Sequence, residues 1–172
     1  LDSGSFSKLP DSDNIIYLIG TKFGTKFGTI GNPSRTWAVN TIAPANAMRR
    51  YPSSRFVALS TGNIYPFSFA TGGGSVETDP LEPVGEYANA AVGRERIFDF
   101  DSLEQQTAMA MIRLNYATDL RYGVFTDLAI KVATGQPIDL TQGYFNCIWR
   151  GDAKVSDGNY PQPPTWVTKS LC

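Results

Sequence analysis

The sequence contains no histidine, and this absence excludes several kinds of chemistry. Catalytic triads that depend on histidine are excluded, as are the usual zinc sites with histidine ligands. Proton transfer near neutral pH must therefore use tyrosine, lysine, carboxylates or water. The two cysteines, Cys147 and Cys172, suit neither a disulfide framework nor a metal site. We therefore expect a reducing, cytoplasmic location and no bound metal.

Long apolar runs are missing as well. No run approaches the roughly 18 apolar residues of a membrane span, and residues 1–14 do not resemble a signal peptide, so no membrane partner is expected. The chain has 172 residues, 42% of them hydrophobic, and a formal net charge of −1. These values are ordinary for one globular domain with a real core.

Acidic residues are absent between Asp13 and Glu77. The basic residues of this segment are Lys22, Lys26, Arg35, Arg49, Arg50 and Arg55. One interpretation is that basic loops and helix ends happen to fall here. The other is a basic, glycine-rich rim that attracts an anionic ligand such as a phosphate. The basic residues are scattered and do not line one face, so no nucleic-acid partner is expected.

Apolar runs alternate with helical patterns along the chain, which predicts a parallel α/β sheet with helices on both faces. Strands are expected at residues 15–19, 55–60 and 108–115. Helices are expected at residues 34–50, 86–98 and 123–134. The first strand is a continuous apolar run, which is typical of a strand buried on both faces.

Prolines and glycines mark the interruptions of this pattern. Pro44, inside the first expected helix, predicts a kink or an early break. The loop at residues 61–82 is too long to be only a connector, and loops of this length are usually functional or mobile. Short strands are further expected at residues 137–138 and 145–149.

The candidate chemistry lies around the second expected strand. Thr61 follows this strand directly, and Tyr87 stands at the start of the next helix, after the long loop. In an open parallel α/β sheet, ligands bind outside the carboxyl ends of the strands. Thr61 and Tyr87 are therefore predicted to share a ligand.

This arrangement resembles the extended short-chain dehydrogenases/reductases, the family of NAD-dependent epimerases and dehydratases. The SS(S/T)xxVYG motif of the family looks like residues 60–65 (STGNIY), and its YxxxK tyrosine looks like Tyr87, which Arg94 and Glu95 follow. The similarity covers about residues 14–152. It implies a Rossmann-like three-layer fold, an NAD or NADP cofactor, and a hydroxylated small-molecule substrate for which a nucleotide-sugar is the family-level expectation.

The resemblance also implies roles for individual residues. Tyr87 would be the general acid/base and Thr61 would orient the substrate oxygen, with Asn40 as the third member of the catalytic set. The cofactor would contact Leu18, Ile19, Gly20, Asn115 and Tyr116. The substrate would contact Asn63 and Arg113. A homodimer through the helix at residues 86–98 is the assembly typical of the family.

Two features depart from the family pattern. Ala91 stands where the family has a lysine, so the cation that normally stabilises the tyrosinate is missing from that position. Arg94 shares the helix face of Tyr87 two turns away, roughly 10 Å along the axis. The family's first three strands, with their glycine fingerprint, do not match this chain, so the fold is expected to be incomplete at the N-terminus, with an exposed sheet edge.

The glycines of the first loop offer a different interpretation. Gly24, Gly28 and Gly31 form a GxxxGxxG run between a strand and a helix, as in a dinucleotide-binding turn. An acidic residue should then follow the second strand to hold the ribose, and none occurs there. We expect the chain to divide into a core, residues 1–154, that includes the start of a substrate-binding part, and a proline-rich tail, residues 155–172.

Three functions are compatible with these features. The first is an NAD(P)-dependent epimerase/dehydratase-like oxidoreductase. The second is a catalytically impaired relative that senses a dinucleotide or serves as a scaffold, because Ala91 removes the lysine of the proton relay. The third is a binding module that holds a phosphate or nucleotide with the basic loop at residues 20–31.

Overall fold

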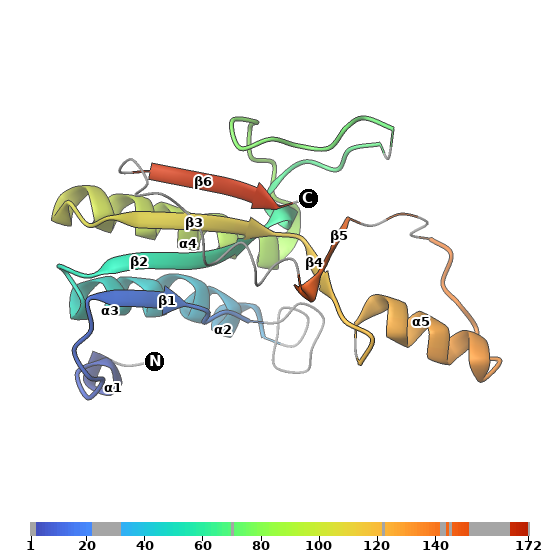
Figure 1. Cartoon of the computed structure of the whole chain (residues 1–172), viewed down its shortest axis with the longest axis horizontal. Helices are drawn as coiled ribbons and strands as arrows, with labels where there is room; N and C mark the ends of the chain where they lie inside the picture. Colours follow the sequence, from blue (N-terminus) through green and yellow to red (C-terminus); the bar gives the residue numbers. More distant parts are fainter. Residues whose placement is uncertain are drawn as a thin grey trace.

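A four-stranded parallel sheet organises the structure, a computed structural model that describes residues 3–21, 32–69, 71–121, 123–141, 144, 146–151 and 166–171. The order of its strands is β1-β2-β3-β6 (Figure 1). The strands are β1 (Asn14–Tyr17), β2 (Arg55–Thr61), β3 (Met109–Leu114) and β6 (Trp166–Leu171). A separate two-stranded parallel sheet pairs β4 (Tyr116–Thr118) with β5 (Cys147–Trp149).

Helices connect these strands in the alternation that the sequence predicts. They are α1 (Ser3–Phe6), α2 (Pro33–Trp37), α3 (Ala43–Arg50), α4 (Gly85–Gln105) and α5 (Val124–Ala133). A π-helical segment, η1 (Ala38–Ile42), joins α2 to α3, and a 3-10 turn, η2 (Gly62–Ile64), follows β2. The predicted Rossmann-like parallel α/β fold is confirmed.

Pro44 does not end the helical run between Pro33 and Arg50. In a regular α-helix a proline ring collides with the carbonyl four residues earlier, and proline has no N–H to donate. The turn ahead of Pro44 is π-helical, and the backbone N–H of Ala43 donates to the carbonyl of Ala38, five residues back. A wider turn at this point therefore takes the place of an early break.

The core lies between one face of the sheet and the helices α3 and α4, which lie side by side behind the strands in Figure 1. Phe56 of β2 is 2% exposed, and Met48 of α3 and Phe98 of α4 are fully buried. The ring of Phe98 meets that of Tyr17 edge-on, with centroids 5.0 Å apart. Burial of each such side chain contributes about 1.5–3 kcal/mol, so these contacts fix α4 against the sheet.

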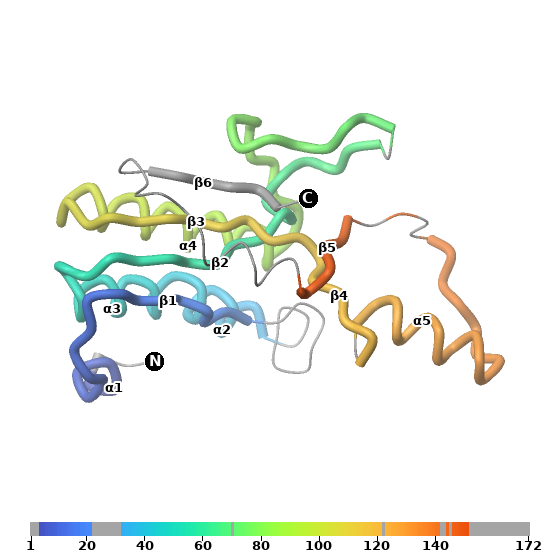
Figure 2. Tube along the Cα trace, in the orientation of Figure 1, coloured from blue at the N-terminus to red at the C-terminus, as the bar shows by residue number. Residues whose placement is uncertain are grey.

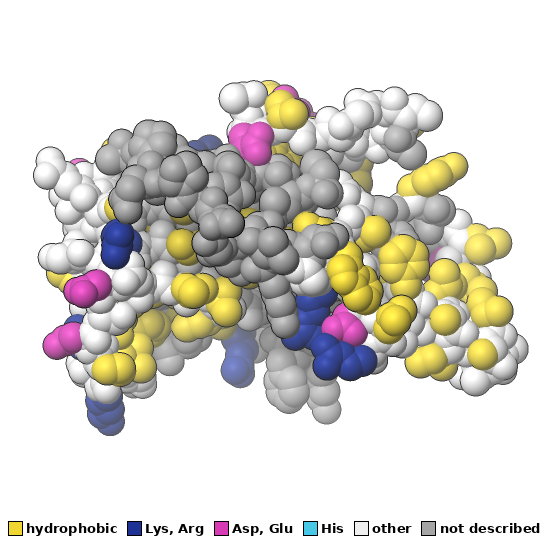
Figure 3. Space-filling model, in the orientation of Figure 1, with side chains coloured by type: hydrophobic (Ala, Val, Ile, Leu, Met, Phe, Trp, Pro, Cys, Tyr) yellow, Lys and Arg dark blue, Asp and Glu magenta, His cyan; other side chains and the backbone are white. Residues whose placement is uncertain are grey.

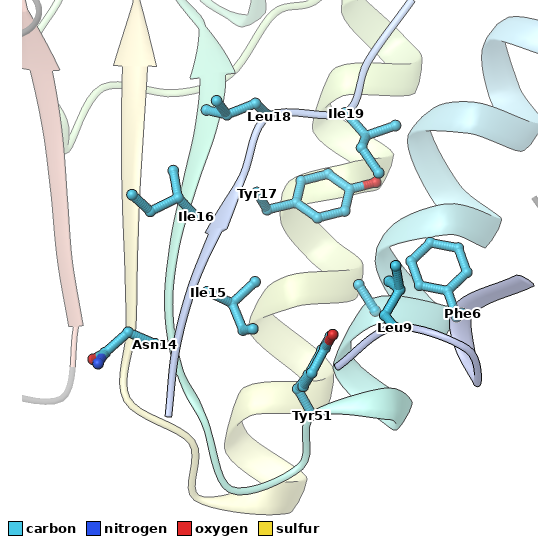
Figure 4. Close-up of a pocket in the computed structure, with 10 residues that line it drawn as sticks. Phe6, Leu9, Asn14, Ile15, Ile16, Tyr17, Leu18, Ile19 and Tyr51 are labelled. Atoms are coloured by element: carbon cyan, nitrogen blue, oxygen red, sulfur yellow. The ribbon is translucent and has the colours of Figure 1, made fainter. Parts of the chain in front are cut away.

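Helices were predicted on both faces of the sheet, but in the described residues they cover one face only, and no helix packs closely on the opposite face. Figure 4 shows Ile16 and Leu18 pointing away from the helices, while Tyr17 points toward them. Ile16 is 69% exposed and Leu18 is 64% exposed. The prediction that the first strand is buried on both faces is therefore wrong, because β1 is an outer strand whose apolar residues alternate between a covered and an open face.

The exposed sheet edge that the resemblance implies is present at β1 within the described residues. A cavity of about 240 Å³ runs along this strand (Figure 4). Its lining is mostly apolar and includes Phe6, Leu9, Ile15, Tyr17 and Tyr51.

The C-terminal third differs in several places from the prediction. None of the residues of α5 is buried, and Figure 2 shows this helix extending away from the main sheet. Hydrophobic side chains gather over it in Figure 3. Within α5, Phe125 is 49% exposed and Val132 is 63% exposed. No strand forms at residues 137–138, where a strand was predicted, and β5 begins at Cys147.

The expected tail contains a strand of the main sheet. Residues 166–171 form β6, which pairs in parallel with β3. Residues 155–165 lie outside the described part of the chain, and the domain boundary after residue 154 stays a prediction. Of the helices that the structure describes, none combines the length and the apolar character that crossing a membrane requires.

Replacing Phe98 by alanine tests whether this side chain anchors α4. We expect Phe98→Ala to lower the free energy of unfolding by about 3–5 kcal/mol, because it leaves a cavity between α4 and β2. Phe100→Ala on the same helix is the matched control, since Phe100 is 63% exposed. Urea denaturation measures both, and equal losses of stability in the two variants would contradict this role of Phe98.

Candidate active site

A cavity of about 280 Å³ lies where β2 and β3 end. It is lined by Leu59, Ser60, Thr61, Asn63, Tyr87, Leu114, Asn115, Tyr116 and Ala117. The structure thus brings five of the predicted site residues, from β2, η2, α4 and the segment that leads from β3 into β4, into one cavity. Carboxyl ends of parallel strands are the places where α/β proteins bind ligands.

Thr61 is held in place by both strand pairing and a local cap. It stands opposite Leu114 in the parallel register of β2 and β3. Its hydroxyl accepts a hydrogen bond from the backbone N–H of Asn63 at 3.2 Å, which caps the 3-10 turn η2. A hydroxyl both donates and accepts, so this bond leaves the proton of Thr61 for a second partner in the cavity.

Gly62 permits the close approach of Asn115 to this turn. A Cβ atom added at Gly62 would lie 2.0 Å from Oδ1 of Asn115, which no real contact allows. The absence of a Cβ atom at Gly62 therefore leaves room for the side chain of Asn115 at this turn. Nothing in the spacing of the sequence indicates this approach, because it joins the ends of two different strands.

Tyr87 lies in the first turn of α4, where Gly85 takes a left-handed φ of 81° to begin the helix. Glu86 beside it accepts a hydrogen bond from the indole N–H of Trp37, which ties the start of α4 to α2. A carboxylate in the first turn also stabilises the positive end of the helix dipole. Tyr87 is half-buried and lines the cavity opposite the strand ends.

Asn40 does not line this cavity; it is buried, 1% exposed, in the π-helical segment. Its amide nitrogen donates to the carbonyl of Thr36 at 3.0 Å and to the hydroxyl of Thr21 at 3.1 Å. Its carbonyl oxygen accepts from a terminal nitrogen of Arg94 at 2.9 Å. Asn40 therefore connects to the Tyr87 helix through Arg94.

Arg113 is directed away from the cavity and into the protein. Its guanidinium pairs with the buried carboxylate of Glu95 at 2.8 Å and donates to the hydroxyl of Tyr65 and, at 3.3 Å, to the carbonyl of Glu77. Burial alone would lower the pKa of Arg113, but the hydrogen bonds and charge of Glu95 and the hydrogen bond to Tyr65 outweigh it, so the net direction is upward. The predicted contact of Arg113 with substrate stays a prediction.

The residues after β1 lie apart from the strand-end cavity. Leu18 and Ile19, expected to contact the cofactor, line the other cavity, and Ile19 is 42% exposed. Gly20 passes close to Arg94, since a Cβ atom at Gly20 would lie 3.0 Å from its guanidinium. The cofactor contacts predicted for these residues remain predictions.

Only part of the predicted basic rim can be placed. Lys22, Lys26 and the glycines of the GxxxGxxG run lie outside the described residues. Arg50 pairs with Asp11 at 2.6 Å and donates to the carbonyl of Leu9, so its charge is neutralised far from the cavity. The binding module built on this loop stays a prediction.

No protein-family model matches the chain, and no curated protein matches it. Solved structures do resemble it. The UDP-glucuronic acid 4-epimerase from Bacillus cereus, in complex with UDP-glucuronic acid and NAD, has a TM-score of 0.77 at 13% identity, over 98% of this chain and 55% of its own. RMD from Pseudomonas aeruginosa, complexed with NADPH, has a TM-score of 0.71 at 15% identity, over 91% of this chain and 59% of its own.

A third similar structure is the DesIV double mutant, a dTDP-glucose 4,6-dehydratase from Streptomyces venezuelae with NAD and DAU bound. Its TM-score is 0.74 at 17% identity, over 88% of this chain and 49% of its own. The chain thus spans about half the length of the structures it matches. At this identity the likeness shows the fold, and it is the fold of the NAD-dependent epimerases and dehydratases that the sequence motifs resemble.

Removing Arg113 tests the ion pair with Glu95. We expect Arg113→Met to lower the free energy of unfolding by about 3–5 kcal/mol, because it leaves the carboxylate of Glu95 buried without its partner. Arg96→Met is the matched control, since Arg96 is exposed and its ion pair with Asp99 is worth about 0–1 kcal/mol. Chemical denaturation compares the two, and an Arg113→Met loss no larger than that of the control would contradict this role.

Proposed function

We propose that the chain belongs to an NAD(P)-dependent, epimerase/dehydratase-like oxidoreductase that acts on a hydroxylated small molecule. The observation that carries the proposal is the cavity at the ends of β2 and β3, which Thr61 and Tyr87 line together. The fold supports it, because the similar structures hold NAD or NADPH, and two of them are named for nucleotide-sugar substrates. A nucleotide-sugar is therefore the proposed substrate class.

The residues around the cavity fit the reactive end of such a cofactor and its substrate. Tyr87 supplies a phenol, Thr61 a hydroxyl, and Asn63 and Asn115 supply amides that both donate and accept hydrogen bonds. A glycine-rich turn at a helix N-terminus, which would bind the pyrophosphate, is absent from the described residues. The cavity of about 280 Å³ is at the small end for ligand sites, and so suits the reacting groups and not a whole dinucleotide.

The chemistry that a bound NAD(P) cofactor would supply at this cavity is hydride transfer to or from the carbon of a substrate alcohol. The protein has to move the proton of the same alcohol. We assign this proton to Tyr87, whose oxygen takes it in the deprotonated phenolate form as the carbonyl forms, and whose phenol gives it back in the reverse direction. The hydroxyl of Thr61 donates to the substrate oxygen and orients it, while its own oxygen accepts from Asn63.

The second candidate is a non-catalytic relative that senses a dinucleotide or serves as a scaffold. Ala91 favours it, because this residue stands where the family has its lysine and is fully buried with Ile64 and Tyr65. An apolar cluster thus fills the place of a charged side chain. A homodimer through α4 and a cytoplasmic location belong to either proposal as predictions; Phe100 and Leu103 on the outer side of α4 are each 63% exposed.

A Tyr87→Phe substitution distinguishes the two candidates. For the enzyme, we expect turnover of a nucleotide-sugar panel, followed by NADH absorbance, to fall by about 10²–10⁴-fold, because the proton acceptor is lost. NADH binding, followed by fluorescence, should stay near wild type. Tyr144→Phe is the matched control, since Tyr144 is 82% exposed.

Each result favours one of the two candidates. Full turnover in Tyr87→Phe would show that Tyr87 is not catalytic. Binding of NADH by the wild type without turnover of any substrate in the panel would favour the sensor. Thr61→Ser should keep most of the turnover and Thr61→Val should lose it, because only serine retains the hydroxyl.

A further inference from the structure

We propose that Arg94 is a positioning residue for Tyr87 and supplies the positive charge that Ala91 does not. This inference rests on the proposed function, because it names a further residue of the same site. Arg94 follows Tyr87 by seven residues, which places it two turns along the same helix face, roughly 10 Å away along the axis. Ala91 lies between them on this face and has no charge to offer.

Arg94 is buried deeply for an arginine. Only 5% of the residue is exposed, and its Nε atom is buried without a hydrogen-bond partner in the described part of the chain. A buried arginine is usually retained with a carboxylate partner, since an unpaired buried charge is costly. Its neighbour Glu95 instead directs its carboxylate to Arg113, and the described residues supply no other carboxylate in an ion pair with Arg94.

Two segments determine where the guanidinium of Arg94 lies. Asn40 accepts its hydrogen bond at 2.9 Å from the π-helical segment, and the amide of Asn40 is itself held by Thr36 and Thr21. Gly20 also comes so close to this guanidinium that a Cβ atom there would lie 3.0 Å away. The side chain is therefore held in one place by neutral groups, which leave its charge available to act on nearby oxygens.

Two phenol oxygens lie within electrostatic reach of this charge. Burial lowers the pKa of Arg94, while the charges of Tyr87, Tyr17 and Glu95 act in the opposite direction. Tyr87 lies on the same helix face as Arg94, and Tyr17 belongs to β1. The hydroxyl of Tyr17 is also buried without a partner in the described residues, and burial raises its pKa while the charge of Arg94 lowers it.

Three titratable groups act on Arg94 in the described part of the chain. Tyr17 approaches from β1, and Tyr87 and Glu95 belong to α4, whereas the contact from the π-helical segment, Asn40, does not titrate. The charge of Glu95 is balanced by Arg113. Tyr87 is the member of this set that also lines the strand-end cavity, so it is the group through which Arg94 acts on a ligand.

This arrangement gives Arg94 a definite part in proton transfer. When Tyr87 passes its proton to a substrate oxygen, the electron pair of that O–H bond remains on the phenol oxygen as negative charge. The guanidinium stabilises this charge, and it does so at every working pH, because an arginine keeps its proton where a lysine can lose it.

The test uses the absorbance of tyrosinate and needs neither cofactor nor substrate. The protein is titrated at alkaline pH with and without Tyr87→Phe, and the difference isolates the signal of Tyr87. We expect Arg94→Met to move this signal upward by about one pH unit, because one charge near it is removed. Arg94→Lys, which keeps the charge, should leave the signal near its wild-type position.

Arg96→Met is the matched control, because it removes the same charge from an exposed position on the same helix. If Arg94→Met moves the signal no further than Arg96→Met does, Arg94 only fills space and the proposal is wrong. Thermal denaturation verifies folding. Should Arg94→Met not fold, Arg94→Gln allows the same comparison, because its amide can still donate to Asn40 while the charge is lost.

Turnover measurements separate this proposal from the proposed function. With an active substrate, Arg94→Met should lower kcat by more than it raises KM and move the acidic limb of the pH profile upward, and Arg94→Lys should restore both. A shifted titration without turnover of any substrate would support the action of Arg94 on Tyr87 and would count against the proposed oxidoreductase activity. If Arg94→Met leaves turnover unchanged, the proposed role of Arg94 is wrong, while the proposed oxidoreductase activity is not affected.

Discussion

The position of helix α4 on the sheet is the constraint on which the candidate site depends. Phe98 inserts into the core against Tyr17 and Phe56, and one turn earlier Glu95 meets Arg113 at the end of β3. These contacts lie on the face of α4 that also carries Arg94. Because a helix is rigid over this length, they determine where its first turn lies, and Tyr87 is thereby placed opposite the end of β2.

The two buried arginines of this region contribute in different ways. The guanidinium of Arg113 donates to the carboxylate of Glu95, to the hydroxyl of Tyr65 and to a backbone carbonyl in the loop after β2. Its charge is therefore paired with a carboxylate and stabilises the structure. Arg94 donates instead to the neutral amide of Asn40, and within the described residues its charge is not paired with a carboxylate. The difference follows from the single carboxylate between them, since Glu95 can face only one of the two.

The open face of the sheet is the other notable feature. Apolar side chains of β1 alternate between the core and this face, and Ile16 and Leu18 remain largely exposed there. Helices α3 and α4 cover one side only, and α5 buries none of its residues. The solved structures with this fold are nearly twice as long as the part that matches this chain, so the chain corresponds to little more than half of such a protein.

The order of the elements and the place of the candidate site follow from the sequence, because both depend on local spacing. The strand before Thr61, the helix after Tyr87 and the rule that parallel strands bind ligands at their carboxyl ends suffice to predict that these two residues meet. The partners of the charged side chains are evident only from the tertiary structure. Arg113 pairs with Glu95, 18 residues away in the sequence, and Arg94 bonds to Asn40, 54 residues away. Such pairings depend on how a helix rotates against a sheet, and the packing of residues such as Phe98 sets that rotation.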